Sequence, residues 1–225
     1  MTIPVKIGSM YDIDWTFCLI ADVDAAAGRA LVQIVDESVG AGATLIQLRA
    51  KSIPTRQIFD LAKGLVSLLR PKHIPLIIND RIDIALASKA DGVHLGQSDL
   101  SLSSSREILG KQRIIGISAN SLSEAMTAEA DGADYIGAGP VFPTHTKIDT
   151  GHILGIEGFK AIRKKVRIPL LAIGGIHAKN ISEVIASGAD GVAVISAVLG
   201  SEDVRTATGQ LIDIVRHSRK VSNTY

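Results

Sequence analysis

Eight short apolar runs, separated by stretches with helical spacing, constrain the fold of this chain more than any other feature. The runs cover residues 17–21, 44–49, 75–79, 92–96, 113–118, 135–138, 169–174 and 191–196. They are continuously apolar and do not alternate, which is typical of strands covered on both faces. Strands that alternate with helices are parallel and joined by crossovers. The sequence therefore predicts an α/β fold with a parallel sheet.

The helical patterns lie between these runs. They cover residues 28–40, 54–69, 82–88, 121–130, 156–165, 181–187 and 204–217. The units average about 28 residues each, which is near the lower size limit of a (β/α)8 barrel. We predict a single TIM barrel domain over residues 1–225, with a lead-in at 1–16 and a tail at 218–225. A doubly wound open sheet is the alternative architecture.

Composition and charge argue against a nucleic-acid-binding or membrane protein. The net charge is +1, with 24 basic and 23 acidic residues, so there is no basic footprint for nucleic acid or anionic lipid. The longest apolar runs are too short to span a bilayer, and Asp12 and Asp14 interrupt any signal-like start. Cys18 is the single cysteine, so it cannot form an internal disulfide. These features predict a cytoplasmic protein.

Three aspartates recur just before predicted strands. Asp91, Asp134 and Asp190 each follow an alanine and precede an apolar run. This weak internal repeat assigns them to the N-terminal end, or bottom, of a barrel, where residues serve stability and not chemistry. We predict a structural role for all three.

Chemistry in TIM barrels occurs at the opposite, C-terminal ends of the strands. Nearly every predicted strand delivers a polar residue or a glycine to that rim. They include Gln47, Arg49, Lys51, Asn79, Asp80, Gln97, Asp99, Ser118, Gly174, Gly175 and Ser196. We therefore expect the functional site at this rim.

An acidic pair follows two neighbouring predicted strands. Asp80 follows the third strand and Asp99 lies in the loop after the fourth. Adjacent strands are about 4.8 Å apart, so the two carboxylates can share one hard cation. Mg²⁺ suits them, because it takes few protein carboxylates and completes its shell with water and phosphate oxygens.

Two anion sites are predicted on the same rim. Arg49, Lys51 and Lys147 supply positive charge that faces the carboxylates, as a clamp for a metal–pyrophosphate group would. Gly175 and Ser196 follow the seventh and eighth strands, where these barrels hold a phosphate with backbone N–H groups and a helix N-terminus.

A loop of residues 139–147 follows the sixth strand. Its two prolines exclude a helix and regular strand pairing. Thr144, Thr146 and Lys147 offer donors suited to a phosphate group. The residues thus predict a barrel enzyme with one monophosphate site and one Mg²⁺–pyrophosphate site. Such an enzyme would transfer a group from pyrophosphate to a phosphorylated acceptor.

Between Leu45 and Ser196 the chain carries an ordered series of motifs: QLRAK, INDR, DGVHLGQSD, GIS, GADYIGAGPVFPTHTK, AIGGI and ADGVAVIS. This series resembles the thiamine-phosphate synthase family. The resemblance implies that a hydroxymethylpyrimidine pyrophosphate is joined to a thiazole phosphate, or to its carboxylated form. The products would be thiamine phosphate and pyrophosphate. Small molecules would be the binding partners, and the oligomeric state is left open.

The resemblance also implies a role for individual residues. Binding of the pyrimidine pyrophosphate would fall to Gln47, Leu48, Arg49, Ala50, Lys51, Asn79, Ser118 and Lys147. Binding of the thiazole phosphate would fall to Thr144, His145, Thr146, Gly175, Ile195 and Ser196. Asp80 and Asp99 would hold one Mg²⁺.

Two positions depart from the family pattern. Asn120 stands where the family and its thiazole tautomerase relatives often carry a histidine, and Leu154 replaces a proline common before the glycine equivalent to Gly155. Asn120 argues against a tautomerase. The alternative functions are a tautomerase-like enzyme and a non-catalytic thiamine-phosphate-binding protein.

Overall fold

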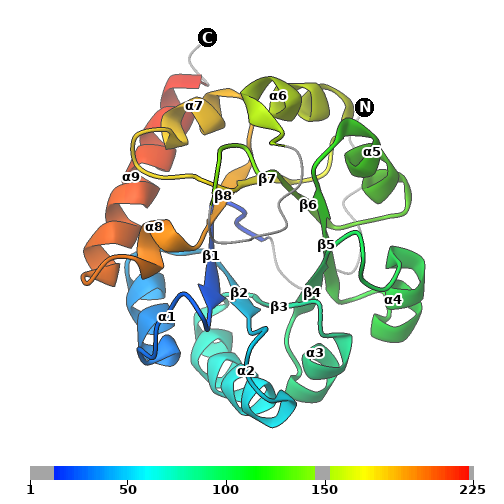
Figure 1. The fold of residues 1–225 in the computed structure, drawn as a ribbon, viewed down its shortest axis with the longest axis vertical. Helices are drawn as coiled ribbons and strands as arrows, with labels where there is room; N and C mark the ends of the chain where they lie inside the picture. The colour runs from blue at the N-terminus through cyan, green and yellow to red at the C-terminus, as the bar shows by residue number, and fades with distance from the viewer. Residues whose placement is uncertain (1–12, 145–152, 223–225) are drawn as a thin grey trace.

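The computed structural model describes residues 13–144 and 153–222, which form a closed (β/α)8 barrel surrounded by helices (Figure 1). The strands are β1 Phe17–Asp22, β2 Leu45–Arg49, β3 Leu76–Asn79, β4 Gly92–Leu95, β5 Ile114–Ala119, β6 Tyr135–Ala138, β7 Leu170–Ile173 and β8 Gly191–Val194. Each strand pairs in parallel with the next, and β1 pairs with β8 through Phe17 and Val192. The predicted TIM barrel is confirmed, and closure of the sheet excludes the open-sheet alternative.

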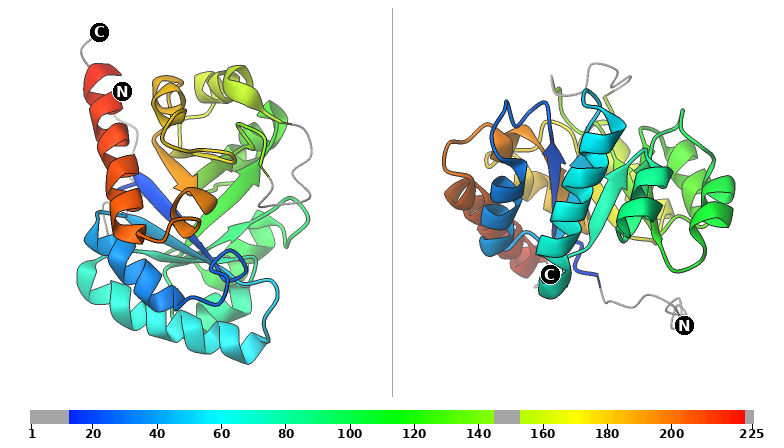
Figure 2. Two further views of the ribbon diagram at one scale, coloured as in Figure 1. Left: turned by 60° about the vertical axis from the view of Figure 1, so that its left-hand side comes forward. Right: turned by 90° about the horizontal axis from the view of Figure 1, so that it is seen from below.

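Helices cover the outside of the barrel, and those before β8 connect successive strands. They are α1 Leu31–Gly40, α2 Thr55–Leu69, α3 Ile82–Ser88, α4 Leu102–Leu109, α5 Leu122–Ala130, α6 Gly155–Lys165, α7 Ile181–Ala186, α8 Ser196–Leu199 and α9 Val204–Ser222, with a 3-10 turn η1 at Arg70–Lys72. The 19-residue α9 packs against α7, α1 and α8, and so completes the outer ring beside β8 and β1 (Figure 2).

Two helices lie outside the predicted helical ranges. The first, α4, carries three consecutive serines, which are poor residues for a helix interior. Ser101 compensates by capping its N-terminus, since its hydroxyl accepts a hydrogen bond from the N–H of Ser104 at 3.2 Å. The second, α8, has four residues, too few to show a helical period. Its formation ends β8 at Val194, two residues before the predicted end.

Side chains along each strand alternate between two cores. The inner core, inside the barrel, contains Cys18, Ile20, Leu45, Ile77, Tyr135, Leu171 and Ala193. Intervening residues such as Leu19 and Ile46 face the larger outer core between sheet and helices. Successive side chains of a strand point to opposite faces of the sheet. The side chains that reach the rim from inside the barrel are therefore those in register with the inner core.

The three recurring aspartates bind the bottom of the sheet together. In each of Asp91, Asp134 and Asp190, Oδ2 accepts a hydrogen bond from a backbone N–H at the start of the preceding strand, at 2.8–2.9 Å. Arg106 and Arg163 pair with Asp134 and Asp190 at 2.5 and 2.6 Å. These bonds satisfy strand-end donors that the ladder leaves unpaired. The predicted structural role is confirmed.

We expect Asp134→Ala to lower the free energy of unfolding by about 1.5–3 kcal/mol, the cost of losing hydrogen bonds to a charged group. The variant leaves the N–H of Ile115 and the guanidinium of Arg106 without this acceptor. Urea denaturation measures the change, and Asp131→Ala, at an exposed position three residues away, is the control. Equal stability of the two variants would contradict the strand-capping role.

Candidate active site

The rim at the C-terminal ends of the strands carries most of the predicted site residues that the structure describes. Five of them share the register of the inner core: Gln47, Arg49, Asn79, Ser118 and Ile195. Gln47 is buried just below the rim, whereas the other four are half-buried. The strands thus bring side chains from β2, β3, β5 and β8 to one end of the barrel interior.

Leu48 and Ala50 have the opposite register. Leu48 is 1% exposed and belongs to the outer core, and Ala50 packs against that core. Their side chains therefore face the helices, and only their backbone groups are suited to contact a ligand at the rim. The difference from the neighbouring Gln47 and Arg49 follows directly from the two-residue repeat of a strand.

The acidic pair lies where β3 and β4 end. The N–H of Asp80 donates to the carbonyl of His94 at 2.9 Å, and Oδ2 of Asp99 accepts from the N–H of Gly96 at 2.6 Å. Burial raises the pKa of the Asp99 carboxyl, the adjacent Asp80 carboxylate raises it further, and Lys51 opposes this. The two carboxylates are therefore close enough to repel each other, as predicted from the neighbouring strands.

Two of the predicted cations are paired with acids. Nζ of Lys51 lies 2.5 Å from Oδ2 of Asp80. Arg49 forms a salt bridge with Asp22, which is 2% exposed and also accepts a hydrogen bond from the N–H of Ala25 at 2.9 Å. Asp22 thus holds the guanidinium of Arg49 at the rim. Asp22 is a site residue that was not predicted from the sequence, although it directly follows the first apolar run.

The loop after β6 begins against β7. Residues 139–144 form neither helix nor strand, as predicted, but the N–H groups of Val141 and Phe142 donate to the carbonyls of Ile173 and Gly174 at 2.9 and 3.1 Å. Thr144 is half-buried at the end of this segment. The predicted ligands His145, Thr146 and Lys147 lie outside the described residues.

The predicted monophosphate site lies between β7 and β8. Because Ile173 pairs with Ala193, Gly175 and Ile195 follow in register at the rim. Gly175 has φ +65°, and a Cβ there would lie 2.5 Å from the carbonyl oxygen of Pro143, so only glycine fits this close approach. Ser196 is exposed at the first position of α8.

A polar cluster lies below the rim inside the barrel. Nδ1 of His94 is 2.8 Å from the hydroxyl of Tyr135, and its Nε2 is 2.9 Å from Oγ of Ser118. Burial raises the pKa of the Tyr135 hydroxyl, and the nearby Gln47 side chain lowers it. Neither His94 nor Tyr135 was predicted from the sequence to be a site residue. The available signal was one histidine inside an otherwise apolar run.

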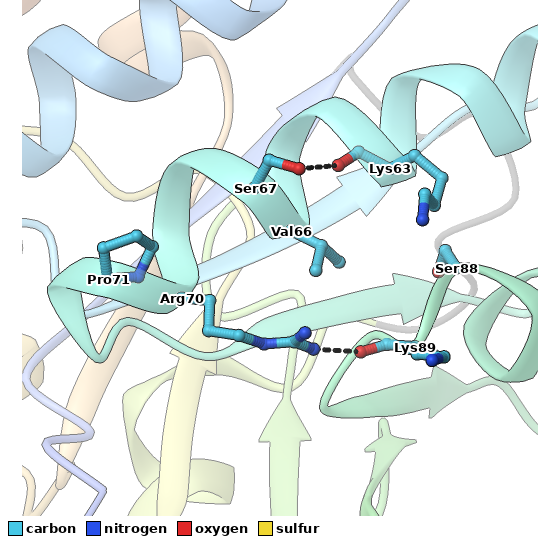
Figure 3. Close-up of a pocket in the computed structure, with 7 residues that line it drawn as sticks. All are labelled: Lys63, Val66, Ser67, Arg70, Pro71, Ser88 and Lys89. Carbon is cyan, nitrogen blue, oxygen red and sulfur yellow. Dashed lines mark hydrogen bonds between the residues drawn. The ribbon is translucent and has the colours of Figure 1, made fainter.

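A hollow of about 410 Å³ lies on the outside of the barrel, between α2, η1 and α3 (Figure 3). It is lined by Lys63, Val66, Ser67, Arg70, Pro71, Ser88 and Lys89. None of these is a predicted site residue, and Pro71 and Lys89 precede the N-terminal ends of β3 and β4, opposite the rim. The rim remains the candidate active site.

Comparison with known proteins agrees with this geometry. Residues 17–198 match the family model described as thiamine monophosphate synthase. The chain is 46% identical over 203 residues to the thiamine-phosphate synthase of Clostridium novyi (strain NT), covering 90% of this chain and 100% of that protein. It is 46% identical over 206 residues to the one from Methanospirillum hungatei JF-1, covering 92% and 100%. The solved thiamine phosphate pyrophosphorylase from Pyrococcus furiosus is 44% identical with a TM-score of 0.85, covering 92% and 98%. This chain therefore belongs to the thiamine monophosphate synthase family.

Proposed function

We propose that this chain is a transferase that makes thiamine phosphate in thiamine biosynthesis. It would join a hydroxymethylpyrimidine pyrophosphate to a thiazole phosphate and release pyrophosphate. Membership of the family supports the reaction. The charged and polar residues on the rim suit the pyrophosphate and phosphate groups of the two substrates. The single observation that carries the proposal is that one rim holds both the acidic pair beside Lys51 and the residues Gly175 and Ser196, which follow β7 and β8.

The acidic pair fits one Mg²⁺. Asp80 and Asp99 repel each other in the absence of a cation, and both present oxygen ligands, which Mg²⁺ prefers. When bound, the ion would neutralise charge on the pyrophosphate of the substrate. Asp80 and Asp99 would hold the ion, and Lys51 would stand beside it as a second positive charge.

The remaining residues would bind and position the substrates. A pyrimidinylmethyl carbon on an amino-substituted ring can carry positive charge, so departure of pyrophosphate can run ahead of attack by the thiazole nitrogen. The enzyme then needs charge neutralisation and alignment more than a general base. Arg49, Asn79 and Ser118 would contact the pyrimidine pyrophosphate, whereas Gly175 and Ser196 would hold the thiazole phosphate.

The two alternative functions fit less well. A tautomerase moves protons, and the side chain of Asn120, at the position of the expected histidine, cannot titrate. A sensor of thiamine phosphate would need only a monophosphate site. It would have no use for an acidic pair beside a lysine, which suits a metal–pyrophosphate group.

Purified protein incubated with both substrates and Mg²⁺ should release pyrophosphate and form thiamine phosphate in equal amounts. Omitting Mg²⁺, or adding a chelator, should stop both. Isomerisation of a thiazole carboxylate without pyrophosphate release would instead indicate a tautomerase. Tight binding of thiamine phosphate without turnover would indicate a sensor.

The described part of the chain has no helix long and apolar enough to cross a bilayer. Small-molecule substrates are consistent with family membership. We propose a cytoplasmic location, which fractionation of cells that express the tagged protein would test.

A further inference from the structure

We propose that Tyr135 and His94 form a positioning relay inside the barrel that holds Ser118 as a hydrogen-bond donor toward the rim. The relay runs from β6 through β4 to β5 by two consecutive hydrogen bonds of 2.8 and 2.9 Å. The inference rests on the proposed function, because Ser118 is expected to donate to the pyrophosphate of the pyrimidine substrate. Tyr135 and His94 would act through Ser118 without touching that group.

The barrel interior is built around these two side chains. A Cβ at Gly116 would lie 2.1 Å from Cζ of Tyr135, and one at Gly137 would lie 3.0 Å from Cε1 of His94. Any larger residue at Gly116 would displace the tyrosine ring. Trp15 packs against that ring with a centroid distance of 4.9 Å and an angle of 36° between the ring planes. The glycines of β5 and β6 and the tryptophan therefore fix the ring in one place.

The relay lies in surroundings where polar groups are costly. Tyr135 is 1% and His94 7% exposed, and their neighbours in the inner core are apolar residues such as Ile20 and Leu171. Buried polar side chains of this kind cost free energy unless every bond is made. Phenylalanine and leucine would fill the same space without that cost. A chain of hydrogen bonds that ends at a rim residue is therefore better explained by a role in substrate binding than by packing.

The proposed relay assigns a donor and an acceptor to each bond. Burial raises the pKa of the Tyr135 hydroxyl well above its ordinary value, so the group keeps its proton. The nearby Gln47 side chain lowers this pKa, as an amide N–H that points toward the phenol oxygen would. The relay directs this proton to Nδ1 of His94, which is 2.8 Å from the hydroxyl.

The imidazole consequently carries its proton on Nε2. Nε2–H donates to Oγ of Ser118, which leaves the hydroxyl proton of the serine available to an acceptor above the rim. The side-chain N–H of Gln97 also donates to the carbonyl of Ser118 at 2.6 Å and fixes its backbone. The opposite tautomer would use the serine proton internally and present only lone pairs to an anionic substrate.

The test measures binding of the pyrimidine pyrophosphate with Mg²⁺ by titration calorimetry, in a set of variants. Ser118→Ala should weaken binding about 10- to 150-fold, the range for one hydrogen bond to a charged group. Tyr135→Phe should weaken binding in the wild-type background. In the Ser118→Ala background, Tyr135→Phe should change the affinity by less than about twofold, because the relay then has no serine to hold. Twofold is about the accuracy to which independent mutational effects add. Ser105→Ala, at a buried serine of α4, is the matched control and should bind as the wild type does.

Two histidine variants separate the relay from simple packing. Glutamine can place an amide N–H near the position of Nε2 and should keep most of the affinity in His94→Gln. Asparagine reaches only the position of Nδ1, so His94→Asn should bind as weakly as Ser118→Ala. Nitrogen-15 spectra of labelled histidine should show the Nε2–H tautomer in a signal that His94→Gln lacks.

Several outcomes would overturn the relay. They are an Nδ1–H tautomer, full additivity of Tyr135→Phe and Ser118→Ala, or equal affinity of the two His94 variants. The relay also fails if Ser118→Ala binds the substrate normally. If the wild-type protein turns over both substrates while these results appear, the relay is wrong and the proposed function stands. If the wild type does not bind the pyrimidine pyrophosphate, the proposed function itself fails.

Discussion

Asp80→Asn and Asp99→Asn are each expected to lower turnover about 100- to 1,000-fold, the range found when one group that stabilises charge in the transition state is lost. Both should also raise the Mg²⁺ concentration needed for half-maximal activity. The reason is that the two carboxylates lie close together just after β3 and β4 and carry like charges, which a bound cation would neutralise. Asparagine keeps the shape but removes the charge that would hold the ion.

Asp83→Asn is the control for this pair. Asp83 lies three residues beyond Asp80 on α3, and its side chain is 61% exposed and paired with Arg81. This variant should keep wild-type turnover and the wild-type Mg²⁺ requirement. Initial rates measured across a range of Mg²⁺ concentrations test whether the acidic pair holds the metal. If the Asp80 and Asp99 variants match the wild type at limiting Mg²⁺, the acidic pair does not hold the metal.

Ser196→Asp should weaken binding of the thiazole phosphate by at least about 10- to 150-fold, the range for losing one charge-assisted hydrogen bond, with repulsion adding to it. Affinity for the pyrimidine pyrophosphate should change little, because its proposed clamp lies at Arg49, Lys51 and the acidic pair. The position is suited to the test. Ser196 is exposed, and an acidic residue at the start of a helix such as α8 is well tolerated.

Ser196→Asn is the neutral variant of matched size. It should lose the serine hydroxyl but not repel the phosphate, so its affinity for the thiazole phosphate should fall between those of the wild type and Ser196→Asp. Titration calorimetry of each substrate against each folded variant provides the comparison. Equal weakening of both substrates, or loss of the pyrimidine substrate only, would mean that the two anion sites are assigned wrongly.

This serine is a sharper probe than the glycine beside it. A Cβ at Gly175 would meet both Pro143 and Phe142 at 3.0 Å or less, and φ is +65°. Any substitution there would displace the loop after β6 and change both sites at once. An effect of Gly175→Asp could therefore not be assigned to repulsion of the thiazole phosphate.

The sequence by itself determined the order of the strands and helices, the boundaries of the strands, and which residues lie at the top and bottom of the barrel. Continuous apolar runs and helical spacing are local signals, so the strands from β1 to β8 could be predicted within one or two residues at most ends. The same holds for the structural role of Asp134 at the bottom of the barrel and for the place of Asp80 and Asp99 just after two neighbouring strands. The exceptions were α4 and α8, whose local signals are weak.

Only the tertiary structure decided which side chains meet. Leu48 and Gln47 are adjacent in the sequence, but the register of β2 in the closed barrel turns one to the helices and the other to the interior. The pairing of Asp22 with Arg49, and the chain from Tyr135 through His94 to Ser118, join separate strands. Such contacts depend on strand register, on closure of the sheet and on the space left by glycines such as Gly116. No local pattern encodes these quantities, because they arise only when all the strands pack together.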